Sequence, residues 1–459
     1  MKRLALIALG LIAVNAAPRP ATQPAKAQQP PAPRSGNVAV PPTTAPAPTP
    51  QNPPPPASEP GHYVGVASCA NSGCHGGTQP LNTTHVLQNE YYTWLNSDRH
   101  AKAYNVLFSD RSARIARNMR MKGKAYQEAG CLDCHSTNVA SRLVSGHIDS
   151  EDGVQCEACH GPASGWRAEH TEAGWSHEQS VARGMIDLRS LTVRGSSCLS
   201  CHMGNAAREV DHDLIASGHP ILAFELDNYS ATMPPHWHPN DTQGVRAWAV
   251  GQIVAFRDSA DNLARHARGG KWPEFSDMSC YNCHHSLKSS SWRQERGWSG
   301  RPGLPAWSPQ HWAVLRQIVG STSPSAKNRL DDLVQQIASG VSRMNDPAGI
   351  ARAADDARSV ANGVIPAIDA TRWSDAQVRS LISAIADDRD FVMRSDVHSA
   401  EQIALALQSL AASLTRRDSR LLRGGMLKAI DGLFAELKDR DDYDPSRFVE
   451  KLQALKASV

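Results

Sequence analysis

Ten cysteines constrain this 459-residue chain more than any other feature. They form five close pairs between positions 69 and 283, and a histidine follows the second cysteine of every pair. Residues at i, i+3 and i+4 lie on one face of a helical turn, so a Cys-x-x-Cys-His segment presents two thiols and an imidazole side by side. Four pairs have this spacing, with histidines at His135, His160, His202 and His284.

Cys-x-x-Cys-His is the signature of covalent haem attachment. We therefore expect five haem c groups, each bound through two thioethers and one proximal histidine. Zinc sites or redox-active thiols are the alternative, which the repetition of the motif disfavours. The expected attachment residues are Cys69, Cys74, Cys131, Cys134, Cys156, Cys159, Cys198, Cys201, Cys280 and Cys283, and the expected proximal iron ligands are His75, His135, His160, His202 and His284.

The first motif is longer than the others and reads Cys69-Ala-Asn-Ser-Gly-Cys74-His75. Its two extra residues have to bulge outward if both thiols are to reach one haem. Asn71 and Gly73 suit a bulge because both tolerate left-handed backbone. A Cys69–Cys74 disulfide, with four haems elsewhere, is the alternative.

The second axial ligands decide what such a protein can do. An iron with two imidazoles suits electron transfer, whereas an iron with an open sixth position can bind substrate. Six further histidines are our candidates for distal ligands: His85, His100, His147, His170, His212 and His219. Acidic neighbours of His212 are expected to orient its ring. His236, His238 and His266 are weaker candidates, and we expect surface positions for His62, His177, His311 and His398.

The ends of the chain predict two further kinds of segment. Residues 1–27 read as a secretory signal peptide, with Lys2 and Arg3 before an apolar run. That run is too short for a comfortable membrane span, although an uncleaved anchor is the alternative. Residues 28–60 are proline-rich and predict a disordered, extended tether. We therefore expect a periplasmic protein.

The rest of the chain predicts a mainly α protein. We expect a loop-rich pentahaem cytochrome domain at 61–304 and a helical-bundle domain without cofactor ligands at 305–459. Helical spacing relates Leu330, Leu333, Ile337, Val341 and Met344, and further helices are expected around 378–385, 422–437 and 448–455. Capping boxes are expected at Ser374–Gln377 and Ser399–Gln402.

Charge argues against a nucleic-acid partner. Residues 1–27 carry four basic residues and no acid, so their removal lowers the formal charge from +3 to −1, and haem propionates make it more negative. We expect redox proteins, of unknown identity, as partners, and membrane association only through an uncleaved signal or a partner. One run of basic residues precedes the second motif: Arg111, Arg114, Arg117, Arg120, Lys122 and Lys124. It is a solvated helix face, a neutraliser of haem propionates or a docking site for an acidic partner.

Two segments, Gly153 to Pro162 and Trp94 with Ser97 to Ala101, resemble the cytochrome c-554 family of multihaem proteins. Ser217 to Pro220, with Phe224-Glu225-Leu226, is similar to a recurring segment of related multihaem cytochromes. The resemblance implies closely packed haems in a mostly helical, loop-rich fold that serves as a periplasmic electron shuttle. It also implies distal-ligand roles for His100 and His170.

The chain departs from this family in having five motifs rather than four, and in its tether and helical tail. It contains no Cys-x-x-Cys-Lys motif, which marks the lysine-ligated reductases among the relatives. An electron carrier without chemistry of its own is our first expectation. The alternative is an oxidoreductase with one open haem that acts on small nitrogen or sulfur oxides.

Overall fold

The computed structural model describes residues 61–84, 86–237, 244–284, 287–289, 304–417 and 425–458, which belong to one unit. Nearly all of its regular structure is helical, and the described residues form only three isolated β-bridges, so the mainly α prediction is confirmed. The helices before residue 305 are α1 Glu90–Ser97, α2 Asp110–Asn118, α3 Ala129–His135, α4 Cys156–His160, α5 His177–Ala182, α6 Leu191–His202, α7 His212–Ala216, α8 Leu226–Thr232 and α9 Val245–Arg268.

Short 3-10 helices connect these elements. They are η1 Val66–Ser68, η2 His100–Lys102, η3 Tyr104–Phe108, η4 Ala125–Gln127, η5 Ser141–Leu143, η6 Ser150–Asp152, η7 Glu169–Thr171, η9 Phe275–Asp277 and η10 Cys280–Asn282. The later helices are α11 Leu315–Thr322, α12 Pro324–Arg343, α13 Pro347–Ala370, α14 Asp375–Ala386, α15 Arg389–Arg394, α16 Val397–Arg417, α17 Met426–Glu436 and α18 Pro445–Lys456. None of the described helices is both long enough and apolar enough to cross a membrane.

The part of the chain before α6 has little apolar core of its own. One small cluster forms around Tyr104 and Leu107, and another around Val64, Ala163 and Trp166. These clusters are too small to fix so many short helices and loops by burial alone. Large apolar groups bound between the segments would supply the missing buried surface.

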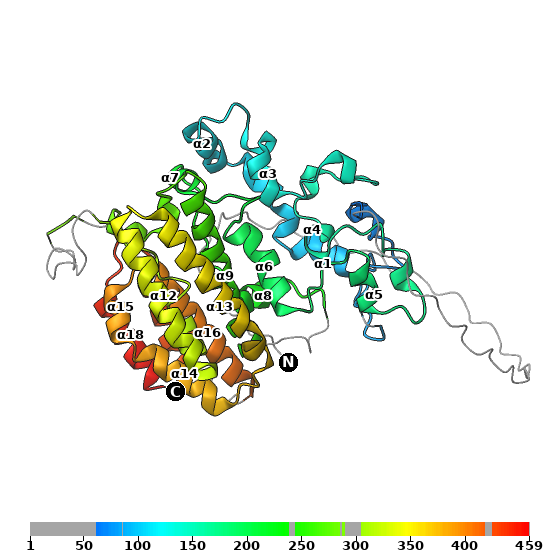
Figure 1. The fold of residues 1–459 in the computed structure, drawn as a ribbon. Coiled ribbons are helices and arrows are strands. Elements are labelled where there is room, and N and C mark those ends of the chain that lie inside the picture. Colours follow the sequence, from blue (N-terminus) through cyan, green and yellow to red (C-terminus); the bar gives the residue numbers. More distant parts are fainter. Residues whose placement is uncertain are drawn as a thin grey trace, which may run out of the picture. The chain divides into compact units, whose positions relative to one another are not determined.

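The main core lies elsewhere and joins both halves of the chain. It includes Leu199 of α6, Trp248 of α9 and most apolar residues of α11 to α18. Helix α9 lies alongside α13, and Figure 1 shows the later helices gathered next to α9 and α6. The helix that carries the fourth motif is therefore anchored in the same core as the C-terminal helices. The domain boundary expected at residue 304 stays a prediction.

The C-terminal helices follow the predicted pattern with two exceptions. Leu330 and Val341 are fully buried on α12, and the capping box at Ser374 and Gln377 begins α14. Met344 is not part of the helix: it follows α12 with left-handed backbone, which ends the helix. The second predicted capping box is also wrong, because Ser399 lies inside α16 and its N–H donates to Asp396 at 3.0 Å. Leu422 lies outside the described residues.

Candidate functional site

Three of the motifs occupy the last turn of a helix. Helices α3, α4 and α6 end at His135, His160 and His202, so each places two thiols and an imidazole on one turn. In the fifth motif, the 3-10 helix at Cys280–Asn282 is continued by a hydrogen bond from the His284 N–H to the Cys280 carbonyl at 2.7 Å. The local backbone thus gives all four standard motifs a helical turn.

The longer first motif closes its bulge through Asn71. The carbonyl of Asn71 accepts from the N–H groups of Cys74 and Gly76, both at 2.9 Å, and its side chain accepts from Gly73 at 2.9 Å. None of the bulge residues has left-handed backbone, so the tolerance for it that we inferred from the sequence is not used. No disulfide joins Cys69 and Cys74, and none joins any of the other eight cysteines.

Four motif histidines each face a second histidine from a distant segment. Two imidazoles that ligate one metal from opposite sides have nitrogen–metal distances of about 2 Å, which places their ring centres roughly 6 Å apart. The observed separations fit a haem iron between the rings. The ring centres lie 6.1 Å apart for His75 and His170, 6.2 Å for His202 and His100, 6.4 Å for His135 and His219, and 6.4 Å for His160 and His236.

Hydrogen bonds to Nδ1 orient six of these eight rings and leave Nε2 as the nitrogen available to a metal. Carboxylates accept from His75 (Glu90, 3.0 Å) and His100 (Asp98, 3.0 Å). Backbone carbonyls accept from the other four, which are His135 (Ala103, 3.0 Å), His170 (Arg167, 2.5 Å), His219 (Pro220, 3.0 Å) and His236 (Pro234, 3.4 Å).

Burial keeps several of these imidazoles neutral, which is the form that ligates a metal. It lowers the pKa of His160 to about 4, with the charge of His236 adding to the effect, and it lowers the pKa of His202 to about 4. Burial also lowers the pKa of His135, His219 and His236. These five rings are therefore held in the neutral form that a metal can bind, whereas the hydrogen bond to Asp98 raises the pKa of His100.

Cysteine side chains of different motifs lie near one another. The thiols of Cys69 and Cys156 interact electrostatically, which joins the first motif to the third. Cys159 interacts in the same way with Cys198 of the fourth motif. A hydrogen bond between Cys134 and Cys201 then joins the fourth motif to the second. The attachment segments thus follow one another in the order first, third, fourth, second.

The fifth motif lies against other parts of the chain. Helix α7 packs on the segment just before it: the His212 ring centre lies 5.5 Å from that of Phe275, and the His212 N–H donates to Glu274 at 2.9 Å. On the C-terminal side, Ser279 donates to Asp396 at 2.6 Å, and His398 hydrogen-bonds Cys280. Our expectation that His398 lies at the surface is wrong, because its residue is only 8% exposed.

The remaining candidates have different positions. His85 and His238 lie outside the described residues. His147 is exposed, and among the described residues no histidine ring pairs with it. The pairing of His236 is the one that sequence reasoning ranked too low. A local signal existed: His219 and His236 both adjoin prolines, and in each case a proline carbonyl accepts from Nδ1.

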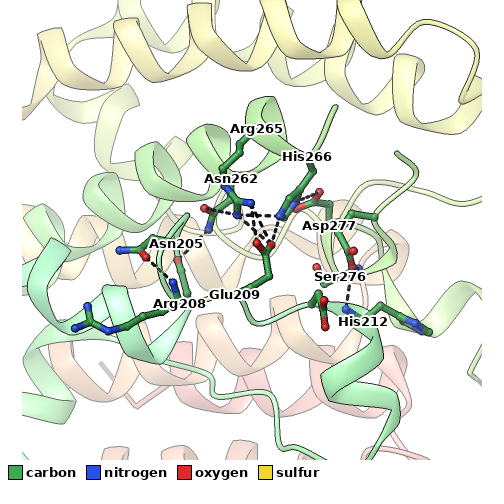
Figure 2. Close-up of polar contacts among 12 residues, drawn as sticks. Asn205, Arg208, Glu209, His212, Asn262, Arg265, His266, Ser276 and Asp277 are labelled. Atoms are coloured by element: carbon green, nitrogen blue, oxygen red, sulfur yellow. Dashed lines mark hydrogen bonds and ion pairs between the residues drawn. The ribbon is translucent and has the colours of Figure 1, made fainter. Parts of the chain in front are cut away.

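A buried polar cluster connects the fourth and fifth motifs. His266 of α9 hydrogen-bonds Glu209, which follows the fourth motif, and Asp277, which precedes the fifth, each at 2.7 Å. Arg265 pairs with Glu209 at 2.9 Å, and Figure 2 shows Glu209 held between Arg265 and His266. Burial lowers the pKa of His266, but Asp277 and Glu209 outweigh it and raise the pKa. The weak ligand candidate His266 therefore has both ring nitrogens occupied.

The comparisons with known proteins identify part of this arrangement. The model of the family "Cytochrome c554 and c-prime" matches residues 69–161, which span the first three motifs and His100. No curated protein and no solved structure matches the chain.

Proposed function

We propose that this chain is an exported pentahaem cytochrome that conducts electrons without chemistry of its own, because residues 69–161 match the model of the cytochrome c554 family and haem c groups transfer electrons. The observation that carries the proposal is the set of four histidine pairs, each made of one motif histidine and one distant histidine. Ring-centre separations of 6.1 to 6.4 Å match the space that one ligated metal requires.

The proposed axial ligands follow from these pairs. His170, His219, His236 and His100 are the distal ligands for the first, second, third and fourth motifs. When bound, each haem supplies one centre that gains or loses a single electron. In the four paired motifs, hydrogen bonds to Nδ1 hold six of the eight imidazoles in place, and the second histidine would occupy the position at which a substrate could otherwise bind.

We assign His212 to the fifth haem, opposite His284. The position of α7 supports this assignment, because His212 contacts Phe275 and Glu274, which lie a few residues before Cys280. Two other histidines near this motif are otherwise engaged: His266 hydrogen-bonds through both ring nitrogens, and His398 hydrogen-bonds the Cys280 thiol.

The spatial order of the motifs supports conduction along a chain of centres. Neighbouring cysteine side chains relate the first, third, fourth and second attachment segments in that order. The polar cluster around His266 ties the fourth segment to the fifth. Electrons would therefore enter and leave at ends of this series, with redox proteins as partners. The signal-like residues 1–27 support a periplasmic location.

The test is spectroscopic. Mature holoprotein should contain five covalent haems per chain by mass and by haem assay. In the oxidised state all five should be low-spin in electron paramagnetic resonance. The oxidoreductase alternative remains a candidate because, among the described residues, His284 is in no histidine pair. A high-spin haem that shifts on addition of nitrite or hydroxylamine would establish that alternative and overturn the carrier.

A further inference from the structure

A strongly basic surface covers the second haem motif. Six cations lie within residues 111–124, and only Asp110 among their immediate neighbours is acidic. All six side chains are exposed, and the structure records no ion pair for any of them within the described part of the chain. We name this the α2 surface: Arg111, Arg114, Arg117, Arg120, Lys122 and Lys124.

Helix α2 is fixed directly over the distal ligand of that motif. Asn118 donates to the Ser217 carbonyl at 3.1 Å, and Ile115 packs beside Gly218, so α2 lies on the segment that carries His219. The charge of Arg111 reaches the His219 ring. The cations are therefore held close to one metal site rather than spread over the protein.

Two exposed apolar side chains adjoin the α2 surface. Val106 and Phe108 of η3, next to α2, are 48% and 56% exposed. Phe108 stacks on Tyr126, with ring centres 4.4 Å apart, and this contact fixes the orientation of the exposed Phe108 ring. Apolar contacts ringed by charges of one sign are typical of surfaces that bind partners of opposite charge.

The position of the second motif gives this surface a role. It stands at one end of the series of neighbouring cysteines, while the protein without its signal carries a formal charge of about −1 before its haems are counted. A local positive surface on an otherwise acidic molecule orients an acidic partner toward one end of the series. We propose that the α2 surface is the docking site for an acidic electron-transfer protein, which exchanges electrons through the second haem. This proposal rests on the proposed function.

The experiment measures electron delivery by stopped flow, with reduced plant-type ferredoxin, an acidic protein, as the probe. The variant reverses three charges of the α2 surface: Arg114→Glu, Arg117→Glu and Arg120→Glu. A matched control reverses three exposed arginines of the C-terminal part of the chain: Arg343→Glu, Arg352→Glu and Arg372→Glu. Both proteins have the same net charge, so any difference reports where the charge lies.

For the wild type, the second-order rate constant should fall as salt is added, because salt screens attraction between exposed charges. The α2 variant should react about tenfold more slowly at low salt and lose most of this dependence, whereas the control should stay close to the wild type. Equal effects of the two triple variants, or a wild-type rate that rises with salt, would overturn the proposal. Glutamine at the same three positions gives the same test with less risk to folding.

Two controls separate this proposal from the proposed function. Haem content and reduction by dithionite report whether the chain is a multihaem electron carrier at all. If both are normal and the α2 variant accepts electrons from ferredoxin as fast as the wild type does, only the proposed docking site is wrong. If covalent haem is absent, the proposed function fails first.

Discussion

The ring of His236 lies 6.4 Å from the ring of His160, although a complete further motif separates the two in the sequence. His236→Ala should therefore open one iron and convert about one-fifth of the haem signal from low-spin to high-spin. Electron paramagnetic resonance of the oxidised protein measures this change. His147→Ala is the matched control and should leave all haems low-spin. The reverse pattern would show that the pairing is not axial ligation.

Glu157 should be essential for the stability of the third motif. Its carboxylate is 2% exposed and accepts from the N–H groups of Val64, Gly65 and Ala163 at 2.7 to 3.0 Å. Glu157→Ala leaves these buried donors without an acceptor, which should cost on the order of 3 kcal/mol in the free energy of unfolding. Denaturant titration of the holoprotein measures the loss. Glu157→Gln keeps one acceptor oxygen and should lose less; an alanine variant as stable as the wild type would contradict this role.

Glu225 should make stability fall as pH rises. Burial, reinforced by the charge of Asp227, raises the pKa of Glu225 to about 8. The folded protein then holds a proton that the unfolded chain releases near pH 4.3, so the contribution present at low pH is lost as pH rises to about 8. The side chain of the Glu225→Gln variant does not ionise, so it lacks this pH dependence.

Melting temperatures at pH 5 and pH 8.5 test this prediction. The melting temperature of the glutamine variant, relative to that of the wild type, should be higher at pH 8.5 than at pH 5. Its amide still accepts at the start of α8, where Glu225 bonds the N–H groups of Asp227 and Asn228 at 2.7 and 2.8 Å. A difference between the two proteins that does not change with pH would refute the raised pKa.

His266→Phe should lower the free energy of unfolding, because it removes the hydrogen bonds that connect the fourth and fifth motifs. The variant leaves Glu209 and Asp277 without their shared partner, which should cost about 3–5 kcal/mol. Since the two carboxylates raise the pKa of His266, its contribution is fully present below its unfolded pKa of about 6.5 and is lost as pH rises through the folded value. The gap between variant and wild type in denaturant titrations should therefore shrink at alkaline pH. A gap that widens would contradict the assignment.

The sequence predicts what is local and leaves open what is tertiary. The expected attachment residues follow from Cys-x-x-Cys-His because spacing within one turn determines which side chains lie together. The C-terminal helices follow in the same way from the period of residues such as Leu330 and Ile337.

Distal pairing joins segments far apart in the chain, so no spacing encodes it. His100, His170 and His219 were among our candidates and do pair with motif histidines, whereas His236 was ranked below His147. The burial of His398 beside Cys280 was missed for the same reason, since it depends on α16 packing against the fifth motif.

The spin state of the oxidised holoprotein tests the central claim most directly. Quantified electron paramagnetic resonance, with the haem count per chain measured on the same sample, should give five low-spin haems that nitrite and hydroxylamine leave unchanged. A high-spin haem that responds to either ligand would mean that one iron is open, and would contradict an electron carrier in which every haem has two histidine ligands.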